Sequence, residues 1–512
     1  MKSNNRIIFN TAITYAQLIV TTILGLFVTR YVLLALGEED YGVYMLVAGV
    51  VSMLNIFSSS MSHASMRYLG HSLGGGDIEE VRKTFNTSML LHIGLGVFLI
   101  ILLEVGGWIM FEFFLNIPLE KIPAARIIYQ FMIVTTFVTI VSLPFDSVIN
   151  AHENLLFLSL MQILDMVLRL VASLFLLARK DLDNLVLYGL FMMIIPIIMR
   201  LIKQVYSVVK YQECSLRLKF YNDKALIKSM LSFTGWELFG TISAICQGQL
   251  RAILINMFFG VRLNSGEGIA KKVNSHVNVL SVGITKAITP QMNKSEGSGD
   301  RNRMIRLTLV GIKYTTFMFA LLAVPIYIEA DHILSIWLDQ VPTYAVIFCQ
   351  LCLAMQLLDK FTWQITNALR SVGKIKEFQV FAGISSILGV GVSYLVFSAG
   401  MGPTSIFFVE IAVILINGLY RLYLGKKEVG INIKDFVLTT TVPVLIPIII
   451  GLLFVVPIHV FFPTSVSRIL LVLLVFVVVS CLCFYYIGIS KSERRTIMGV
   501  INESLRKITH RQ

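Results

Sequence analysis

The sequence predicts an all-α integral membrane protein, and three observations lead to this fold class. Of the 512 residues, 56% are hydrophobic and only 14% are charged, whereas soluble domains carry about 25% charged residues. The mean hydropathy is +0.78. Many of the long apolar runs also reach the ~20 residues that a helix needs to cross the ~30 Å hydrocarbon core of a bilayer. A soluble globular fold is therefore excluded.

The apolar runs predict about fourteen membrane-spanning helices. The first run begins after a basic tip and continues past residue 30 without an A-x-A-like site, so we interpret it as a span and not as a cleaved signal. The expected helices lie at 7–36, 42–66, 86–113, 124–146, 157–178, 185–207, 226–258, 268–290, 306–328, 343–366, 377–398, 404–423, 437–460 and 467–489.

Lys and Arg in the connecting segments predict the orientation of the chain. Nearly all of them lie on the side that carries both termini, and cytoplasmic loops are the ones enriched in Lys and Arg. The opposite side holds only Lys121, Arg179, Lys180 and Arg262. Both termini are therefore expected in the cytoplasm. The formal net charge of +13 needs no nucleic acid to explain it, because these residues face an anionic lipid leaflet.

The sequence also contains signs of an internal repeat. TRYVLLALGEEDYGVYMLV (29–47) resembles LRAILINMFFGVRLNSGEGIAKKV (250–273), and FDSVINAHENLLF (145–157) resembles TWQITNALRSVGKIKEF (362–378), at offsets of about 220 residues. A repeat of six helices has parallel topology, as in transporters with a site between two bundles. We expect two six-helix bundles, 1–210 and 211–424, followed by two helices and a basic tail, 425–512.

Four of the expected helices carry polar residues along one face, because residues three or four apart share a face. They are the first, second, seventh and eighth helices, which the repeat relates in pairs. This symmetry favours a central water-filled cavity, and tight helix packing through small residues is the alternative. The stripes are Asn10, Thr14, Gln17, Thr21, Gly25 and Thr29; Ser52, Asn55, Ser59, His63 and Arg67; Glu237, Thr241, Ala244, Gly248 and Arg251; and Lys271, Asn274, Asn278, Ser281, Thr285 and Thr289.

Two arginines lie deep in apolar helices, where a charge costs ~2.5–3.5 kcal/mol. Arg169 is about 18 Å along its helix and can pair with Asp165 one turn earlier. The pair is either a self-neutralised structural contact or an ion-responsive or substrate-contacting site. Arg251 lies about 13 Å before the end of its helix at Gly260, beyond the full reach of snorkelling. It is predicted to form one wall of a central anion-binding cavity.

The remaining charged candidates have weaker sequence support. Arg30 lies near a helix end and can snorkel to the interface, and Lys271 and Lys272 are expected to open the eighth helix. Asp359 and Lys360 are adjacent, so only one of them lines a cavity. The carboxylates that could couple transport to H⁺ or Na⁺ are Asp165, Glu237 and Asp359. No other cofactor and no metal site is predicted.

Four segments resemble the Wzx-type flippases of bacterial polysaccharide biosynthesis, in the superfamily that also holds MurJ-type flippases and MATE exporters. They are LGEEDYGVYMLV, QGQLRAILINMFFG, LNSGEGIAKKVNSHVN and ITPQMNK, and the resemblance extends from residue 10 to about 425. The family's pattern has a basic residue at Glu267 and a less polar one at Arg251. The resemblance implies an inner-membrane flippase for an undecaprenyl-pyrophosphate-linked oligosaccharide. Arg169 and Arg251 would contact the headgroup, followed by Arg30, Arg67, Lys271, Lys272 and Lys360.

Two rival functions remain open. A MATE-like exporter of small molecules coupled to H⁺ or Na⁺ is expected to have twelve spans and a cavity rich in carboxylates. A membrane-embedded polysaccharide polymerase or glycosyltransferase needs a large outer loop with acid and base residues, and none is present. We therefore expect a transporter and not an enzyme, working beside such polymerases and glycosyltransferases. Arg251→Ala and Arg169→Ala are each predicted to impair flipping without preventing membrane insertion.

Overall fold

The computed structural model describes residues 3–52, 55–113, 119–178, 183–215, 223–259, 261–338, 341–490 and 493–494. Every regular element in these ranges is a helix, which confirms the all-α fold class. Gly260, the loop residues Arg179 and Lys180 and the basic tail beyond residue 494 lie outside the described residues.

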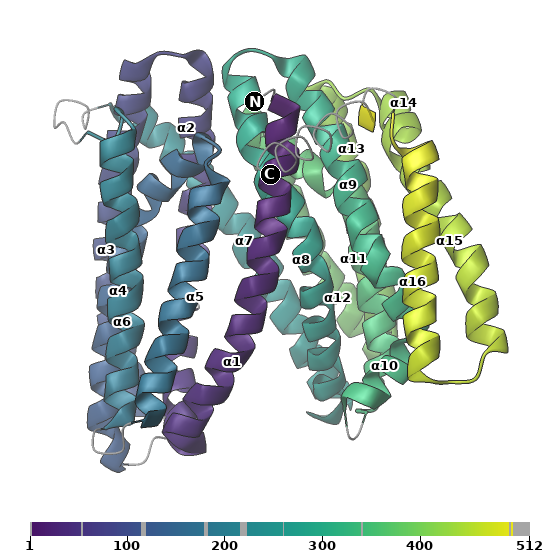
Figure 1. Cartoon of the computed structure of the whole chain (residues 1–512), viewed down its shortest axis with the longest axis horizontal. Coiled ribbons are helices and arrows are strands. Elements are labelled where there is room, and N and C mark those ends of the chain that lie inside the picture. Colours follow the sequence, from purple (N-terminus) through teal and green to yellow (C-terminus); the bar gives the residue numbers. More distant parts are fainter. Residues whose placement is uncertain are drawn as a thin grey trace, which may run out of the picture. The chain divides into compact units, whose positions relative to one another are not determined.

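The helices follow one another through short connections (Figure 1). Short 3₁₀ or π-helical stretches occur at Leu119–Lys121, Gly425–Val429, Val437–Thr441 and Phe484–Gly488. The α-helices are α1 (Ser3–Ser52), α2 (Asn55–Gly75), α3 (Ile78–Phe113), α4 (Ile122–Ala151), α5 (Leu155–Ala178), α6 (Asn184–Lys210), α7 (Lys224–Phe259), α8 (Val261–Gly297), α9 (Arg301–Ile328), α10 (Ala330–Trp337), α11 (Ala345–Val372), α12 (Lys376–Ser398), α13 (Ser405–Leu424), α14 (Ile433–Phe436), α15 (Val442–Phe461) and α16 (Val466–Cys483).

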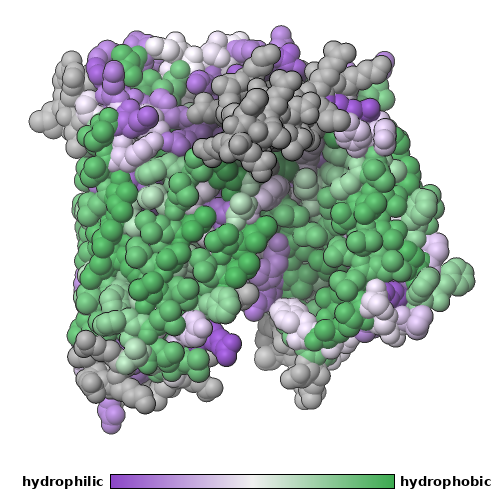
Figure 2. All heavy atoms as spheres, viewed as in Figure 1, coloured by the Kyte–Doolittle hydropathy of each residue, from purple (hydrophilic) through white to green (hydrophobic). Residues whose placement is uncertain are grey.

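Among the described residues, 12 helical segments are long and apolar enough to cross a membrane, two fewer than predicted. The two predicted spans that are not among the 12 are 42–66 and 268–290. Residues 53 and 54 of the first lie outside the described residues, and the second lies within α8, which is helical throughout but too polar. Both are second helices of the proposed repeat. On the visible face, hydrophobic residues cover the middle of the helices and hydrophilic residues gather toward their ends (Figure 2).

Gly37 bends α1 into two arms. Its φ of 76° and ψ of 174° are not helical, although the helix continues on both sides. A positive φ costs glycine little because it has no Cβ. The predicted break after residue 36 is therefore confirmed as a kink. Arg30 lies two turns before this kink and is exposed.

The chain divides into two compact units. The N-terminal unit comprises 12–238 and 293–299, and the C-terminal unit comprises 1–11, 239–292 and 300–512. This division differs from the predicted limits at residues 210 and 424. It falls within α1, α7 and α8, because each of these helices has residues in both units. The segment after residue 424 belongs to the C-terminal unit and does not stand apart. The cavity predicted between two bundles stays a prediction.

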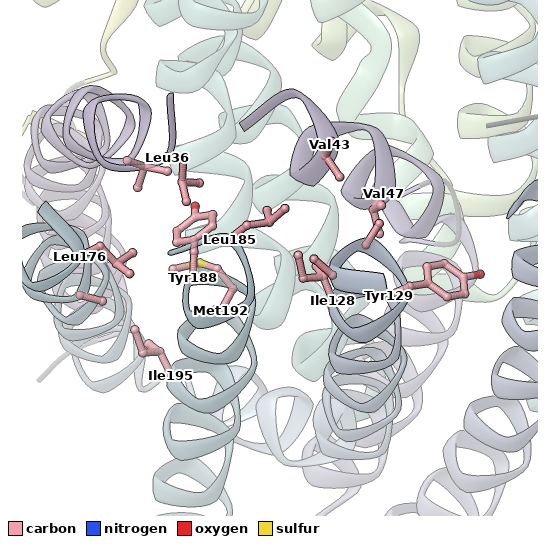
Figure 3. Packing of buried hydrophobic residues seen from close by; sticks show 14 of the residues in the cluster. Leu36, Val43, Val47, Ile128, Tyr129, Leu176, Leu185, Tyr188, Met192 and Ile195 are labelled. Atoms are coloured by element: carbon pink, nitrogen blue, oxygen red, sulfur yellow. The ribbon is translucent and has the colours of Figure 1, made fainter. Parts of the chain in front are cut away.

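The N-terminal unit has a core where α4 and α6 pack against each other and against the two arms of α1. Tyr188, Met192 and Ile195 of α6 point into this core beside Leu36 (Figure 3). The Tyr44 and Tyr188 rings lie 4.6 Å apart. The Tyr129 hydroxyl donates to the Leu103 carbonyl oxygen at 2.6 Å, so this buried ring keeps a polar partner. This core holds α4, α5 and α6 together, and α5 carries the Asp165–Arg169 pair.

In the C-terminal unit, α15 and α16 form a hairpin that covers α9. Phe317 of α9 stacks on Phe484 at 3.8 Å, within a core that also holds Val444, Val455 and Phe476. The apolar window of α9 is 72% buried, the largest share among the 12 candidate spans. The hairpin, α15–α16, and α11 together make α9 an internal helix.

Charged groups fasten both ends of this hairpin. At one end Glu329, which is 1% exposed, accepts from Arg468 Nη2 at 2.7 Å and pairs with His459 Nδ1 at 2.8 Å. At the other end Lys313 Nζ of α9 donates to both carboxylate oxygens of Glu493 at 2.7 Å. The Glu329–His459–Arg468 contact, called the clamp below, links the start of α10 to both helices of the hairpin.

Gly74 lets α2 approach the end of α8 within the N-terminal unit. A Cβ at this position would overlap the Lys294 carbonyl oxygen, a backbone atom that cannot turn away. We expect Gly74→Ala to lower the free energy of unfolding by about 1–3 kcal/mol, through overpacking. Thermal unfolding in detergent measures this change. Gly75→Ala is the matched control because its Cβ would meet only ordinary contact, at 3.8 Å from Gly297. Equal melting temperatures for the two variants would contradict the close approach.

Candidate functional site

The most developed charge cluster in the described residues surrounds Arg251 of α7. Its Nε donates to Glu267 Oε1 of α8 at 2.6 Å, and its Nη1 donates to Glu410 Oε2 of α13. The guanidinium carbon lies 5.4 Å from the centre of the Phe407 ring. All three charged residues are at most 9% exposed. Arg251 is therefore held by two carboxylates and an aromatic ring, all inside the C-terminal unit.

Lys271 is the accessible member of this cluster. Its Nζ lies 2.9 Å from Glu267 Oε1 and 3.2 Å from the Gly248 carbonyl oxygen, while 41% of its side chain is exposed. The prediction that Lys271 and Lys272 open the helix is wrong, since α8 already begins at Val261. Arg251 and Lys271 carry two positive charges and Glu267 and Glu410 carry two negative charges, so the cluster is formally neutral.

This neutral cluster corrects the prediction that Arg251 is one wall of an anion-binding cavity. Its donors are taken by Glu267 and Glu410, and its side chain is 11% exposed. The sequence could not reveal this pairing, because Glu410 lies 159 residues away from Arg251. One signal in the sequence did point to the pairing: Glu267 is acidic at a position where the flippase family has a basic residue. An acid at Glu267 and an arginine at Arg251 compensate each other.

The Asp165–Arg169 pair on α5 forms as predicted. Arg169 Nε donates to Asp165 Oδ2 at 2.7 Å, and Nη1 donates to Met192 Sδ of α6 at 3.1 Å. The side chains of Asp165 and Arg169 are 26% and 28% exposed. The pair is thus satisfied locally, yet it is accessible enough to exchange partners, so both interpretations of it remain.

Arg67 on α2 differs from these arginines. Its guanidinium carbon lies 4.6 Å from the Tyr68 ring centre and 5.3 Å from that of Phe233 on α7, which together form an aromatic pair. Its Nε is buried and has no hydrogen-bond acceptor within the described part of the chain. No ion pair is seen for Arg67 among the described residues. Arg67 is therefore held inside the N-terminal unit by aromatic rings, with the charge of Glu296 acting on it.

The predicted ion-coupling carboxylates have basic partners. Asp359 pairs with Arg421 of α13, whose Nη1 also donates to Thr362 at 3.1 Å. Glu237 is fully buried and lies 3.8 Å from His63 Nδ1. Sequence reasoning missed Arg421 because it lies in the last turn of its helix, where a basic residue is ordinary.

The remaining lysine candidates lie apart from the Arg251 cluster. Lys360 is 7% exposed, and its Nζ lies 5.8 Å from the Phe319 ring centre of α9. It is packed in protein and does not line a wetted surface. Lys272 is exposed, with its Nζ 6.0 Å from the Trp337 ring centre. The structure therefore brings together only Arg251 and Lys271 of the basic candidates in the C-terminal unit.

Comparisons with known proteins agree with this helical arrangement. Residues 14–175 match the MatE family model, and no curated protein matches. Among solved structures, the chain is similar to an outward-facing multidrug resistance MATE family transporter of the MOP superfamily (14% identity, covering 84% of this chain and 96% of that one, TM-score 0.72). It is also similar to a MATE in a bent conformation (14% identity, 84% and 98% covered, TM-score 0.73).

A third similar structure is a MOP superfamily transporter from Pyrococcus furiosus, described as having a binding pocket of reversed polarity (12% identity, 84% and 96% covered, TM-score 0.71). The proteins matched in fold are transporters and not enzymes, as predicted for this chain. Residues 14–175 are therefore similar to the MatE family, and the chain shares its multi-pass fold with these solved MATE and MOP superfamily transporters.

Proposed function

We propose that this transporter is a flippase for an undecaprenyl-pyrophosphate-linked oligosaccharide. It would work in the bacterial inner membrane with both termini in the cytoplasm, by alternating access. The observation that carries the proposal is Arg67, whose buried Nε has no acceptor in the described part of the chain and whose guanidinium lies beside two aromatic rings. Arginine binds phosphate oxygens bidentately, and aromatic faces offer flat apolar surface to the rings of a sugar.

A further observation supports a sugar-phosphate cargo. The polar face of α8 places Asn274 and Asn278 one turn apart, and their Oδ1 atoms are buried without a donor in the described part of the chain. Such oxygens can accept from sugar hydroxyls. Polysaccharide polymerases and glycosyltransferases are the expected working partners.

A MATE-like exporter of small molecules coupled to H⁺ or Na⁺ is the second candidate. The descriptions of the similar structures, multidrug transporters among them, favour this candidate over the flippase. The buried carboxylates Glu237, Glu267 and Glu410 also agree with cation coupling, as does the count of 12 apolar spans. Against it stand Arg67 and the resemblance to the flippases in the primary structure.

Arg67→Gln is expected to slow leaflet exchange of a lipid-linked oligosaccharide in proteoliposomes about tenfold or more, the size expected for a lost charged hydrogen bond. Arg67→Lys keeps the charge but loses the paired N–H donors of the guanidinium, so an intermediate exchange rate is expected. Thermal unfolding of each variant separates this effect from misfolding. Wild-type exchange in Arg67→Gln would overturn the role of Arg67. Efflux of a lipophilic cationic dye by the wild type, without exchange of the oligosaccharide, would instead establish the exporter.

A further inference from the structure

Four charges in the C-terminal unit alternate in sign along one chain of contacts. The order is Glu410 of α13, Arg251 of α7, then Glu267 and Lys271 of α8. Side-chain exposure falls from 41% at Lys271 to 2% at Glu267 and 8% at Glu410. The chain of contacts therefore has one accessible end and one buried end, which lie on different helices.

A single oxygen joins the two halves of this chain. Glu267 Oε1 lies 2.6 Å from Arg251 Nε and 2.9 Å from Lys271 Nζ, so two cations share one acceptor atom. Hydrogen bonds in a buried chain polarise one another, and an ion pair away from water is screened little. When Lys271 moves away from Glu267, the Glu267 carboxylate therefore interacts with Arg251 alone and attracts it more strongly. Arg251 then holds Glu410 less strongly.

We propose that this chain is an anion-sensing relay, in which an oxyanion that binds Lys271 loosens the contact between Arg251 and Glu410. Lysine binds phosphate as a point charge, and Lys271 is the one member of the chain exposed enough to meet a ligand. The ligand class is a phosphate or pyrophosphate group. This identification of the ligand rests on the proposed function. The response appears at α13, and the relay thus converts headgroup binding on α8 into a looser α7–α13 contact.

Cys352 of α11 offers a reporter at the buried end. It is 6% exposed and belongs to the same core cluster as Phe407, the ring beside Arg251. A chain that retains Cys352 alone is made by replacing the other five cysteines, Cys214, Cys246, Cys349, Cys481 and Cys483. In phosphatidylcholine nanodiscs, inorganic pyrophosphate is expected to accelerate modification of Cys352 by N-ethylmaleimide about fivefold or more, the usual lower size of coupling between sites.

Two variants separate the relay from a general effect of the anion. Lys271→Gln removes the competing cation, so Cys352 is expected to react at the stimulated rate without pyrophosphate and to show no further response. Lys272→Gln removes an equal charge from the adjacent exposed position, outside the chain of contacts, and keeps the response. A pyrophosphate response that persists in Lys271→Gln would overturn the relay, as would a silent wild type.

The remaining arms identify the anion and guard against misfolding. Nanodiscs with phosphatidylglycerol test a lipid phosphate as the source, and acceleration by that lipid alone supports the same relay with a lipid headgroup. If the single-cysteine chain does not fold, the pyrophosphate-induced melting shift of the native chain is compared with that of Lys271→Gln, and equal shifts overturn the relay. If the protein exchanges the oligosaccharide but Cys352 does not respond to pyrophosphate, the relay is rejected and the flippase is not. If Cys352 responds to pyrophosphate but no oligosaccharide is exchanged, only the flippase is rejected.

Discussion

Arg251→Ala is expected to lower the free energy of unfolding by about 3–5 kcal/mol, because the change leaves buried charges without their partner. Glu267 and Glu410 are 2% and 6% exposed, and Arg251 is the residue that bonds both of them. Lys271 can compensate only Glu267. The loss of transport predicted for Arg251→Ala is therefore expected to follow from loss of the folded protein.

Thermal unfolding of the purified chain in detergent measures this effect. Lys272→Ala is the matched control, since it removes an exposed charge that contacts no carboxylate among the described residues. A triple variant, Arg251→Met with Glu267→Met and Glu410→Leu, is expected to recover most of the stability, because apolar residues can replace a buried ion cluster. A melting temperature for Arg251→Ala equal to that of Lys272→Ala would contradict the buried cluster.

Arg468→Ala is expected to destabilise the chain by a similar amount, about 3–5 kcal/mol, by breaking the clamp on the hairpin. Glu329 would stay buried with only His459 as a partner, and the carbonyl oxygens of His459 and Phe462 would lose the donor Nη1. Limited proteolysis of the connection between α15 and α16, together with thermal unfolding, detects a detached hairpin. Asp331→Ala, at an exposed carboxylate on α10, is the control. Unchanged protection in Arg468→Ala would contradict the clamp.

The clamp also predicts a pH dependence. Burial raises the pKa of Glu329, but hydrogen bonds from His459 and Arg468 outweigh it and hold the pKa below the usual value. A carboxylate with a lowered folded-state pKa stabilises the fold above its unfolded pKa of about 4.3. This contribution is lost as pH falls through the lower folded-state value. The stability difference between wild type and Glu329→Gln should therefore shrink below about pH 4.3. A stability difference between the two proteins that stays constant down to pH 3 would contradict a stabilising role of the ionised Glu329.

Local patterns in the sequence predicted most of the helices. Apolar runs located the 12 segments that can span a membrane, but they also predicted spans at 42–66 and 268–290, which are not among the 12. Gly37 predicted the break in α1, and the i, i+4 spacing predicted the Asp165–Arg169 pair. These features depend on residues within one or two helical turns, which is the range that periodicity can report.

The candidate site was predicted only in part, because the partners of its charged residues lie far away in the sequence. Sequence patterns selected Arg251 because a charge in an apolar helix is costly, but they could not identify Glu410 as its partner. Asp359 was likewise selected without Arg421, which lies 62 residues away. Lys360 was expected at a cavity, yet the packing of α11 against α9 buries it. Each of these outcomes depends on which helices become neighbours.

By itself, the sequence determined that this protein is an all-α membrane protein and where the 12 apolar spans lie, but it did not predict that 268–290 is too polar to qualify as one. The cost of exposing apolar or charged groups in a bilayer acts on each segment separately. Only the tertiary structure decided which distant charges become partners. It paired Arg251 with Glu267 and Glu410, placed Arg67 beside the rings of Tyr68 and Phe233, and packed the α15–α16 hairpin on α9. Charge compensation is a property of packed neighbours, and packing brings together residues that are distant in the chain.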